Sequence, residues 1–277
     1  AIRLIRKDNP FPTTCGFICE HPCEARCRRN MIDDSINIRG LKRVAADFAG
    51  EVEPPKCAPS TGKKIAVLGG GPGGLSAAYY LQLMGHQTTV YEMLPKLGGM
   101  LRYGIPSYKL EKDVIEAEID VMREMGVEIK TGVEVGKDIS LDELRAQGYN
   151  AFYLAIGCSA GRRPGVPGDD AEGTFTAIDY LKDANCGGAE YTGRVVVVGG
   201  GNVAIDVART STRVGDYNVS MFCLEDRANM PASEEEIEEA VEEGVKLDCG
   251  WGPKEILTEN GKVTGIVLKR CTSVKDA

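Results

Sequence analysis

The stretch KKIAVLGGGPGGLSAAYYLQLMGHQTTVYE, residues 63–92, decides the fold. Ile65–Leu68 is a short apolar run typical of a buried parallel strand, and a helical pattern follows the glycines to about Met84. A second strand is expected at Thr88–Tyr91, and it is followed directly by Glu92. The order of strand, glycine turn, helix, strand and acid predicts a unit that binds a dinucleotide.

The glycines of this turn have the spacing G-x-G-x-x-G, at Gly69, Gly71 and Gly74. The first allows a tight turn, the second lets backbone approach a pyrophosphate, and the third lets helix and strand pack closely. The free N–H groups and the dipole of the helix N-terminus favour an anion there. Glu92 is expected to bind the ribose hydroxyls. Glycine turns also arise for structural reasons alone, but strand, helix and acid in register favour nucleotide binding.

The pattern returns in RVVVVGGGNVAIDVARTSTRVGDYNVSMFCLE, residues 194–225. Val195–Val198 is the expected strand, Asn202–Val214 the helix, and another strand ends at Glu225. Alanine replaces the third glycine of the turn (GGGNVA, residues 199–204), a variant that the fingerprint allows. Two such turns indicate two nucleotide sites, and a protein with two sites usually passes a hydride between nicotinamide and flavin.

Glu225 also bears on which nicotinamide is bound. A carboxylate at the end of the second strand hydrogen-bonds the ribose 2′-OH of NAD and repels a 2′-phosphate, whereas NADP sites place arginine there. NAD(H) is therefore favoured. Arg227, two residues on, is the residue that could reach a phosphate instead. A solvated loop is the structural alternative for both side chains.

Four cysteines at identical spacing lie in CGFICEHPCEARC, at Cys15, Cys19, Cys23 and Cys27. In one continuous helix the outer pair would stand roughly 18 Å apart, too far for one metal centre. Pro22 argues against a continuous helix, so the chain can fold back. Four thiolates suit an iron–sulfur cluster and also a structural zinc ion, and the spacing leaves both open.

Disulfides and inert buried thiols are the other interpretations of this run. The chain shows no signal segment and no apolar run of membrane-spanning length, which indicates a cytosolic protein in which disulfides are rare. Its 277 residues are enough for two compact units plus an extension. The net charge of -8 gives no electrostatic footprint for nucleic acid or an anionic membrane.

Three further stretches have structural interpretations. The acidic run SEEEIEEAVEEG, residues 233–244, is expected to be a helix with a serine cap and a solvated face. EKDVIEAEIDVMREMG, residues 111–126, has the apolar spacing of a packing helix that ends at Gly126. Phe152–Ile156 is expected to be a buried strand that leads into a glycine turn.

Five motifs in order resemble the small (β) subunit of glutamate synthase and its relatives: NPFPTTCGFICEHPCEARC, INIRGLKRVAADF, GGGPGGLSAAYYL, LGGMLRYGIPSYKL and GGGNVAIDVAR. The relatives include the N-terminal half of dihydropyrimidine dehydrogenase, the large subunit of electron-bifurcating NADH-dependent ferredoxin:NADP oxidoreductases, and flavin modules of hydrogenase and formate dehydrogenase complexes. The resemblance covers essentially the whole chain.

The resemblance implies an α/β protein with two Rossmann-like dinucleotide-binding domains behind a helical iron–sulfur domain. The helical domain, which would hold a 4Fe–4S cluster, is expected at residues 1–60. The first part of an FAD domain is expected at 61–160, and an NAD(P) domain inserted into it at 161–277. Relatives have a further cysteine cluster upstream and a Gly-Asp motif downstream that grips the flavin, so the chain is expected to be truncated at both ends.

The site residues follow from the motifs and from the resemblance together. The residues expected to contact FAD are Gly69, Gly71, Pro72, Gly73, Gly74, Glu92, Met93, Gly98, Gly99, Met100, Leu101, Ile105, Val135 and Gly157. Those expected at the nicotinamide nucleotide are Gly199, Gly201, Asn202, Val203, Asp206, Glu225 and Arg227. Cys15, Cys19, Cys23 and Cys27 are the expected metal ligands, serving one cluster together or sharing a second with upstream cysteines.

The resulting hypothesis is an electron-transfer flavoprotein subunit that passes electrons between NAD(H), FAD and 4Fe–4S clusters. Partner redox subunits are expected, with ferredoxin as one candidate acceptor and electron bifurcation as one candidate role. NADPH-using relatives have tyrosine–arginine–arginine where this chain has Cys223, Leu224 and Glu225, which again favours NADH. Hydride transfer needs no side-chain acid or base, so no catalytic residue is named. The alternative is a zinc-stabilised nucleotide-binding scaffold or sensor without catalysis.

Overall fold

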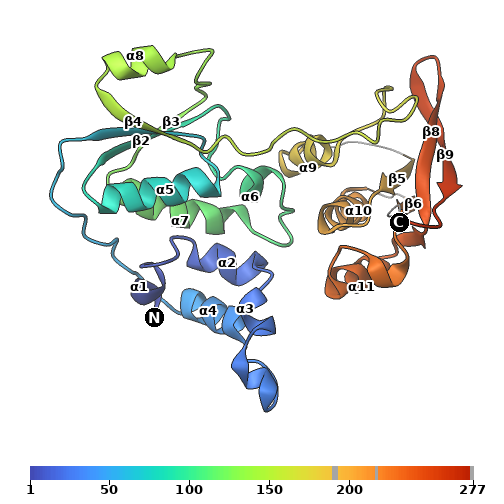
Figure 1. The fold of residues 1–277 in the computed structure, drawn as a ribbon, viewed down its shortest axis with the longest axis horizontal. Coiled ribbons are helices and arrows are strands. Elements are labelled where there is room, and N and C mark those ends of the chain that lie inside the picture. The colour runs from blue at the N-terminus through green and yellow to red at the C-terminus, as the bar shows by residue number, and fades with distance from the viewer. Residues whose placement is uncertain (189–192, 216–217, 275–277) are drawn as a thin grey trace. The chain divides into compact units, whose positions relative to one another are not determined.

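The computed structural model describes residues 1–188, 193–215 and 218–274. The chain divides into two compact units, residues 1–158 and 159–277 (Figure 1). Each unit contains its own parallel sheet and its own hydrophobic core.

The first unit is built on a four-stranded parallel sheet in the order β3-β2-β1-β4. Its strands are β1 (Lys64–Leu68), β2 (Gln87–Glu92), β3 (Glu128–Thr131) and β4 (Tyr149–Leu154). The longer helices of this unit are α5 (Pro72–Leu83) and α7 (Lys112–Glu124), and two shorter ones are α6 (Met100–Tyr103) and α8 (Leu141–Ala146). Figure 1 shows α5 and α7 on one face of the sheet and α8 on the other. The expected strand–turn–helix–strand unit at residues 63–92 is therefore confirmed.

Short helices precede this sheet and pack on its helical face. They are α1 (Ile2–Ile5), α2 (Pro12–Ile18), α3 (Pro22–Ala25), the 3₁₀ turn η1 (Arg28–Met31) and α4 (Ile38–Asp47). The helical conformation is interrupted between α2 and α3, because His21 has a left-handed conformation, with φ of 35°, and Pro22 starts the next helix. The expected interruption of the cysteine run is confirmed.

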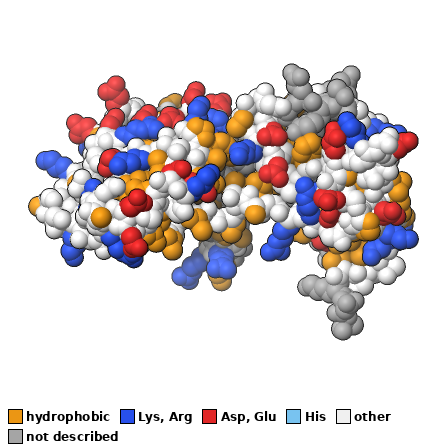
Figure 2. Space-filling model, turned by 90° about the horizontal axis from the view of Figure 1, so that it is seen from above, with side chains coloured by type: hydrophobic (Ala, Val, Ile, Leu, Met, Phe, Trp, Pro, Cys, Tyr) orange, Lys and Arg blue, Asp and Glu red, His pale blue; other side chains and the backbone are white. Residues whose placement is uncertain are grey.

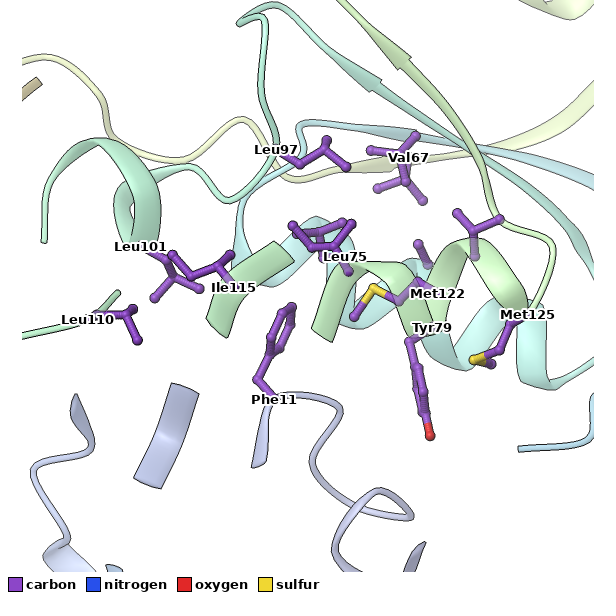
Figure 3. Packing of buried hydrophobic residues seen from close by; sticks show 14 residues of the cluster. Phe11, Val67, Leu75, Tyr79, Leu97, Leu101, Leu110, Ile115, Met122 and Met125 are labelled. Atoms are coloured by element: carbon purple, nitrogen blue, oxygen red, sulfur yellow. The ribbon is translucent and has the colours of Figure 1, made fainter. Parts of the chain in front are cut away.

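The main core of the first unit is formed by the sheet, by α5 and α7, and by the N-terminal segment that packs on these two helices (Figure 3). Ile115, Ile119 and Met122 of α7 are fully buried, as the helical spacing of residues 111–126 predicts. The ring of Phe11 comes from the N-terminal segment and points toward α5 and α7 in Figure 3. The Tyr79 hydroxyl donates to the Arg6 carbonyl over 3.0 Å. The N-terminal segment is thus part of the same core.

The prediction of a buried strand at residues 152–156 is wrong about burial. Its strand, β4, pairs with β1 at the edge of the sheet and is largely exposed. The side chains of Tyr153, Leu154 and Ile156 are 46%, 69% and 77% exposed. An apolar run alone does not distinguish a central strand from an edge strand, since that depends on which other strands pair with it.

The second unit has a three-stranded parallel sheet in the order β5-β6-β7 and an antiparallel hairpin. The strands are β5 (Arg194–Val198), β6 (Asn218–Cys223), β7 (Lys246–Cys249), β8 (Trp251–Glu259) and β9 (Lys262–Arg270). The helices are α9 (Ala177–Asn185), α10 (Asn202–Val214) and α11 (Glu234–Glu242), with a 3₁₀ turn η2 (Arg227–Asn229). The second glycine pattern is confirmed, although β6 ends at Cys223, two residues before the expected end at Glu225.

The prediction that the acidic helix α11 has a solvated face is also wrong in part. Arg209 of α10 is only 5% exposed and forms ion pairs with Glu236, Glu239 and Glu243, the last at 2.7 Å. Arg213 also pairs with Glu243, at 2.6 Å. One side of the acidic run is therefore bound to α10 rather than solvated. The sequence of α11 alone does not predict these ion pairs, because the arginines that form them belong to α10.

No helix in the described ranges is both long enough and apolar enough to cross a membrane. On the face drawn in Figure 2, acidic and basic side chains are interspersed. This distribution agrees with the acidic net charge and with the absence of a basic footprint in the sequence.

The ion pairs of Glu243 predict acid sensitivity of the second unit. Burial by itself raises the pKa of this carboxyl, but hydrogen bonds from Arg213 and Arg209 outweigh it and lower the pKa to about 2, from an ordinary value of 4.5. A lowered folded-state pKa gives stability that is present above pH 4.5 and is lost as the pH falls toward 2. Solvent screening of the partly exposed Glu243 side chain limits this contribution to roughly 2 to 3 kcal/mol.

The measurement is the urea midpoint against pH, followed by fluorescence of Trp251, the chain's single tryptophan. We expect Glu243→Gln to lower the midpoint at pH 7 and to flatten its fall between pH 4.5 and pH 2. Glu242→Gln, an exposed neighbour on the same helix, is the control and should behave as wild type. Equal curves for the two variants would contradict the assignment.

Candidate functional site

The first glycine turn has no room for side chains at two positions. Gly69 has φ of +113°, and a Cβ there would lie 2.2 Å from the Ala155 carbonyl oxygen. A Cβ on Gly74 would lie 1.9 Å from the Gly69 carbonyl oxygen. Both distances are far below contact, so α5 can approach β1 and the end of β4 only because these residues are glycine.

Gly71 and Gly73 of the same turn face open space. A Cβ on Gly73 would meet nothing within 4 Å, and a Cβ on Gly71 would have only the Gly99 Cα, at 3.8 Å, as a neighbour. The backbone is therefore bare on this side, next to the first N–H groups of α5. Bare backbone at a helix N-terminus suits a pyrophosphate, so this part of the chain fits the dinucleotide that the motif implies.

Glu92 is placed beside the same turn. Its side chain is buried, and its two carboxylate oxygens accept from the backbone N–H groups of Gly70, at 2.7 Å, and Leu94, at 2.8 Å. A carboxylate oxygen can accept more than one hydrogen bond, so these contacts leave acceptor capacity for ribose hydroxyls. The carboxylate also fixes the glycine turn against the end of β2.

The loop at 98–105 packs directly on the glycine turn. The Gly98 N–H donates to the Gly70 carbonyl over 2.8 Å, and Gly99, with φ of +50°, is so close that a Cβ would lie 2.8 Å from the Gly71 Cα. Met100 is partly exposed, whereas the Leu101 side chain belongs to the hydrophobic core. Contact of Leu101 with a bound flavin would therefore come from its backbone.

Two cations hold this loop, and sequence reasoning missed both. Lys112 at the start of α7 donates to the carbonyls of Ile105 and Leu101. Burial, with a smaller effect of the nearby Arg102 charge, lowers the pKa of Lys112 to about 8. Arg102 is buried, donates to the Leu97 carbonyl and pairs with Glu116. Arg102 stands inside the motif LGGMLRYGIPSYKL, but its burial is a tertiary feature.

The remaining residues expected at FAD follow the carboxyl ends of strands of this sheet. Met93 is half-exposed directly after β2. Gly157 has φ of +70° and lies two residues after Ala155, whose N–H donates to the Leu68 carbonyl over 2.8 Å. This segment therefore passes beside the glycine turn. Val135 forms a strand-like bridge with Ile139 in the segment between β3 and α8.

The second glycine turn is built in the same way. Gly199 has φ of +146° and a Cβ there would meet the Ala204 Cβ at 3.2 Å, while a Cβ on Gly201 would meet nothing within 4 Å. Glu225 is half-buried, and its Oε2 atom lies 2.8 Å from the position that a Cβ on Gly200 would occupy. The carboxylate is therefore aimed at the glycine turn, as a ribose-binding acid would be.

The other residues expected at the second turn differ in role. The Asn202 side chain accepts from the Ser233 N–H over 2.9 Å and so joins the start of α10 to the start of α11. Val203 is half-exposed and Asp206 half-buried on α10. Arg227 donates to Glu234 over 2.9 Å, so its guanidinium is held by a carboxylate.

A cleft of about 690 Å³ opens beside Glu225. Its lining comes from the loop after β6 and from the ends of β7 and β9: Leu224, Glu225, Asp226, Asn229, Pro231, Cys249, Gly250, Arg270, Cys271, Thr272, Ser273 and Val274. The cleft lies at the carboxyl ends of parallel strands, where open α/β sheets bind ligands.

The structure does not bring the four cysteines of the run together. Among the described residues, no three or more His, Cys, Asp or Glu side chains are placed to hold one metal ion. Cys15 packs against the core, and burial raises the pKa of its thiol. Backbone N–H groups of Ile36 and Arg29 lower the pKa of Cys27, which favours the thiolate that binds metals. All four cysteines of the run are free thiols, and thiolate sulfur is the ligand that an iron–sulfur cluster needs. Which of them bind a cluster stays a prediction.

Comparison with family models gives two matches that together cover most of the chain. Residues 63–275 match the pyridine nucleotide-disulphide oxidoreductase model. Residues 1–53 match the model described as dihydropyrimidine dehydrogenase domain II, 4Fe-4S cluster. These matches correspond to the part of the chain with the two glycine turns and to the part with the cysteine run.

Individual proteins resemble the chain over most of its length. NADPH-Fe(3+) oxidoreductase subunit beta of Geobacter sulfurreducens is 41% identical over 98% of this chain and 42% of its own length. Glutamate synthase [NADPH] small chain of Escherichia coli K12 is 35% identical over 98% of this chain and 61% of its own length. The chain thus spans less than half of the first relative.

Among solved structures, FprA of Mycobacterium tuberculosis in complex with NADPH has a TM-score of 0.65 at 20% identity. The match covers 77% of this chain and 64% of FprA. At this identity the likeness concerns the fold alone.

The glycine geometry predicts separable effects on folding and on flavin binding. Gly74→Ala should destabilise the first unit by about 3 kcal/mol or more, because its Cβ overlaps backbone that has no freedom to move. Gly71→Ala should fold normally but retain at least about tenfold less FAD, since its methyl group fills the open side of the turn. Denaturant midpoints and flavin content of the complete natural protein measure both effects. Full flavin occupancy in folded Gly71→Ala would refute the phosphate assignment.

Proposed function

The chain belongs to the pyridine nucleotide-disulphide oxidoreductase family, and from this we propose that it is the electron-transfer flavoprotein part of a multi-subunit oxidoreductase. It would pass electrons between a nicotinamide nucleotide, FAD and 4Fe–4S clusters. We assign FAD to residues 61–160, the nicotinamide to 161–277 and the cluster to the helical segment 1–60.

The observation that carries this proposal is the pair of glycine turns with bare backbone at Gly71 and Gly201. Each turn is followed by a carboxylate directed at it, Glu92 in the first unit and Glu225 in the second. Cys15, the first cysteine of the run, packs on the same core as the first turn. These features support the proposal that one chain would hold a flavin, a nicotinamide and a cluster with thiolate ligands.

Each group of residues has a separate task. FAD, when bound, converts two-electron hydride chemistry into the one-electron transfers that iron–sulfur clusters carry. Two such transfers balance each hydride taken from the nicotinamide. The turn at 69–74 would bind the flavin pyrophosphate and the loop at 98–105 would lie along the flavin ring. The turn at 199–204 would bind the nicotinamide nucleotide.

A partner subunit would take the electrons onward. The relatives that resemble this chain are named as a beta subunit and a small chain, which supports assembly with a larger redox protein. The relatives' names refer to different reactions, Fe(3+) reduction in one and glutamate synthesis in the other. We therefore propose that the partner determines the final acceptor, with ferredoxin or an electron-bifurcating partner as candidates.

NAD(H) is the nicotinamide that we propose, although both relatives named above are NADPH proteins. The Glu225 carboxylate faces the turn where the adenosine ribose would lie, and it would repel a 2′-phosphate. Arg227, which could attract that phosphate, is already paired with Glu234. Charge near the ribose thus favours a 2′-hydroxyl.

The test is anaerobic analysis of iron, acid-labile sulfide and flavin in the complete natural protein, with spectra before and after NADH. We expect iron, sulfide and flavin in stoichiometric amounts and bleaching of the flavin band on addition of NADH. Dithionite should produce the EPR signal of a reduced 4Fe–4S cluster. Zinc in place of iron, with no flavin, would refute the proposal and favour a zinc-stabilised binding scaffold.

Charge reversal at Glu225 tests the nicotinamide. Glu225→Arg should lower kcat/KM for NADH and raise it for NADPH, changing their ratio by about tenfold or more, which corresponds to about 1.4 kcal/mol. Steady-state reduction of an artificial acceptor measures both constants. Glu255→Arg, an exposed position on β8, introduces the same charge change as a control. An unchanged ratio in Glu225→Arg would remove the role given to this residue.

A further inference from the structure

The first turn of α2, the helix that carries Cys15, is bound by a carboxylate from far along the chain. Glu118 of α7 is 3% exposed. One of its oxygens, Oε1, accepts from the Thr13 N–H over 2.6 Å. The other, Oε2, accepts from the Thr14 N–H over 3.2 Å and from the Thr14 hydroxyl over 2.6 Å.

Burying a charge is costly unless its hydrogen bonds are made, and here both oxygens of Glu118 have partners. Two of the three donors are backbone N–H groups at the start of α2, whose directions are set by the helix. The contact therefore specifies both the position and the orientation of α2 against α7. Packing of Phe11 in the neighbouring core has no such directionality, so the carboxylate sets the alignment.

The same helix, α7, also holds the loop expected along the flavin. Lys112 binds the carbonyls of Leu101 and Ile105, and Glu116 binds Arg102 of that loop. Lys112 and Glu118 are about 9 Å apart along α7, from its rise of about 1.5 Å per residue. One rigid helix thus contacts the loop at 98–105 at one end and the cysteine-bearing helix near its middle.

We propose that α7 sets the position of the cysteine segment relative to the flavin loop, and that Glu118 is the positioning residue for electron exchange between the two. This inference rests on the proposed function. Cys19 ends α2 and its N–H donates to the Cys15 carbonyl over 3.2 Å, so a shift of the first turn of α2 moves both cysteines. Electron transfer between fixed centres weakens steeply with distance, which makes this alignment matter.

The experiment compares Glu118→Gln with Glu124→Gln in the complete natural protein. Gln keeps the volume of Glu but offers one acceptor oxygen and turns an NH₂ donor toward the Thr13 and Thr14 donors. Glu124 is an exposed residue near the end of the same helix and receives the same substitution as a control. The readouts are amide hydrogen exchange in residues 12–18, flavin reduction by NADH, and the following reduction of the cluster by the flavin.

For Glu118→Gln we expect hydrogen exchange at Thr13 and Thr14 to become about tenfold faster, as loss of charge-assisted hydrogen bonds implies. Reduction of the flavin by NADH should stay within about twofold of wild type, because the substitution does not touch the glycine turns, while cluster reduction should slow by about tenfold. Glu124→Gln should match wild type in all three. Wild-type exchange and wild-type cluster reduction in Glu118→Gln would overturn the inference.

A second variant tests the same inference if Glu118→Gln does not fold. Thr14→Val keeps the shape of the buried Thr14 and removes only the hydroxyl donor to Glu118. It should show the same changes at smaller size, and wild-type behaviour of this variant would also overturn the inference.

The readouts separate this inference from the proposed function. Flavin and cluster present, but with electron exchange indifferent to Glu118, would leave the function standing and remove the positioning role. A wild-type protein without flavin or iron would refute the function and the electron-exchange role together. Hydrogen exchange would then still report whether Glu118 holds α2.

Discussion

The close approach of α5 to the sheet, possible only without side chains at Gly69 and Gly74, is the constraint on which the first unit depends. It places Leu75 and Tyr79 of α5 in the core, where α7 packs against them. The N-terminal segment then adds Phe11 to the same core (Figure 3). The glycine turn thus serves twice, since the backbone that packs tightly on one side is left bare on the other.

Packing and polar contacts contribute differently to the attachment of the cysteine segment. Burial of an aromatic side chain such as Phe11 contributes about 1.5–3 kcal/mol but allows sliding, because the hydrophobic effect has no direction. Hydrogen bonds to a charged group contribute about as much, and they fix geometry. The segment is therefore held by apolar burial and aligned by Glu118, while Lys112 and Arg102 align the loop at 98–105.

The two units use one motif for two environments. Glu92 is buried and bound to backbone N–H groups, so it stabilises its turn. Glu225 is half-buried beside a cleft, and the hydrogen bonds that η2 donates to Glu234 of α11 and to Asp226 hold the loop around it. An acid at the end of the second strand therefore has a role that depends on what packs around it.

The sequence by itself determined the two strand–turn–helix–strand units, the break at Pro22 and the packing helix ending at Gly126, because glycine spacing, proline and apolar periodicity act over a few residues. The resemblance to the glutamate synthase small subunit also came from local motifs, and the comparisons confirm it. The burial of side chains and the pairing of charged groups could not be predicted from these local patterns. β4 is exposed at the edge of its sheet, the acidic helix α11 is bound by Arg209, and Glu118 is a buried clamp on α2. Each depends on a partner distant in the chain, and only the tertiary structure brings such partners together.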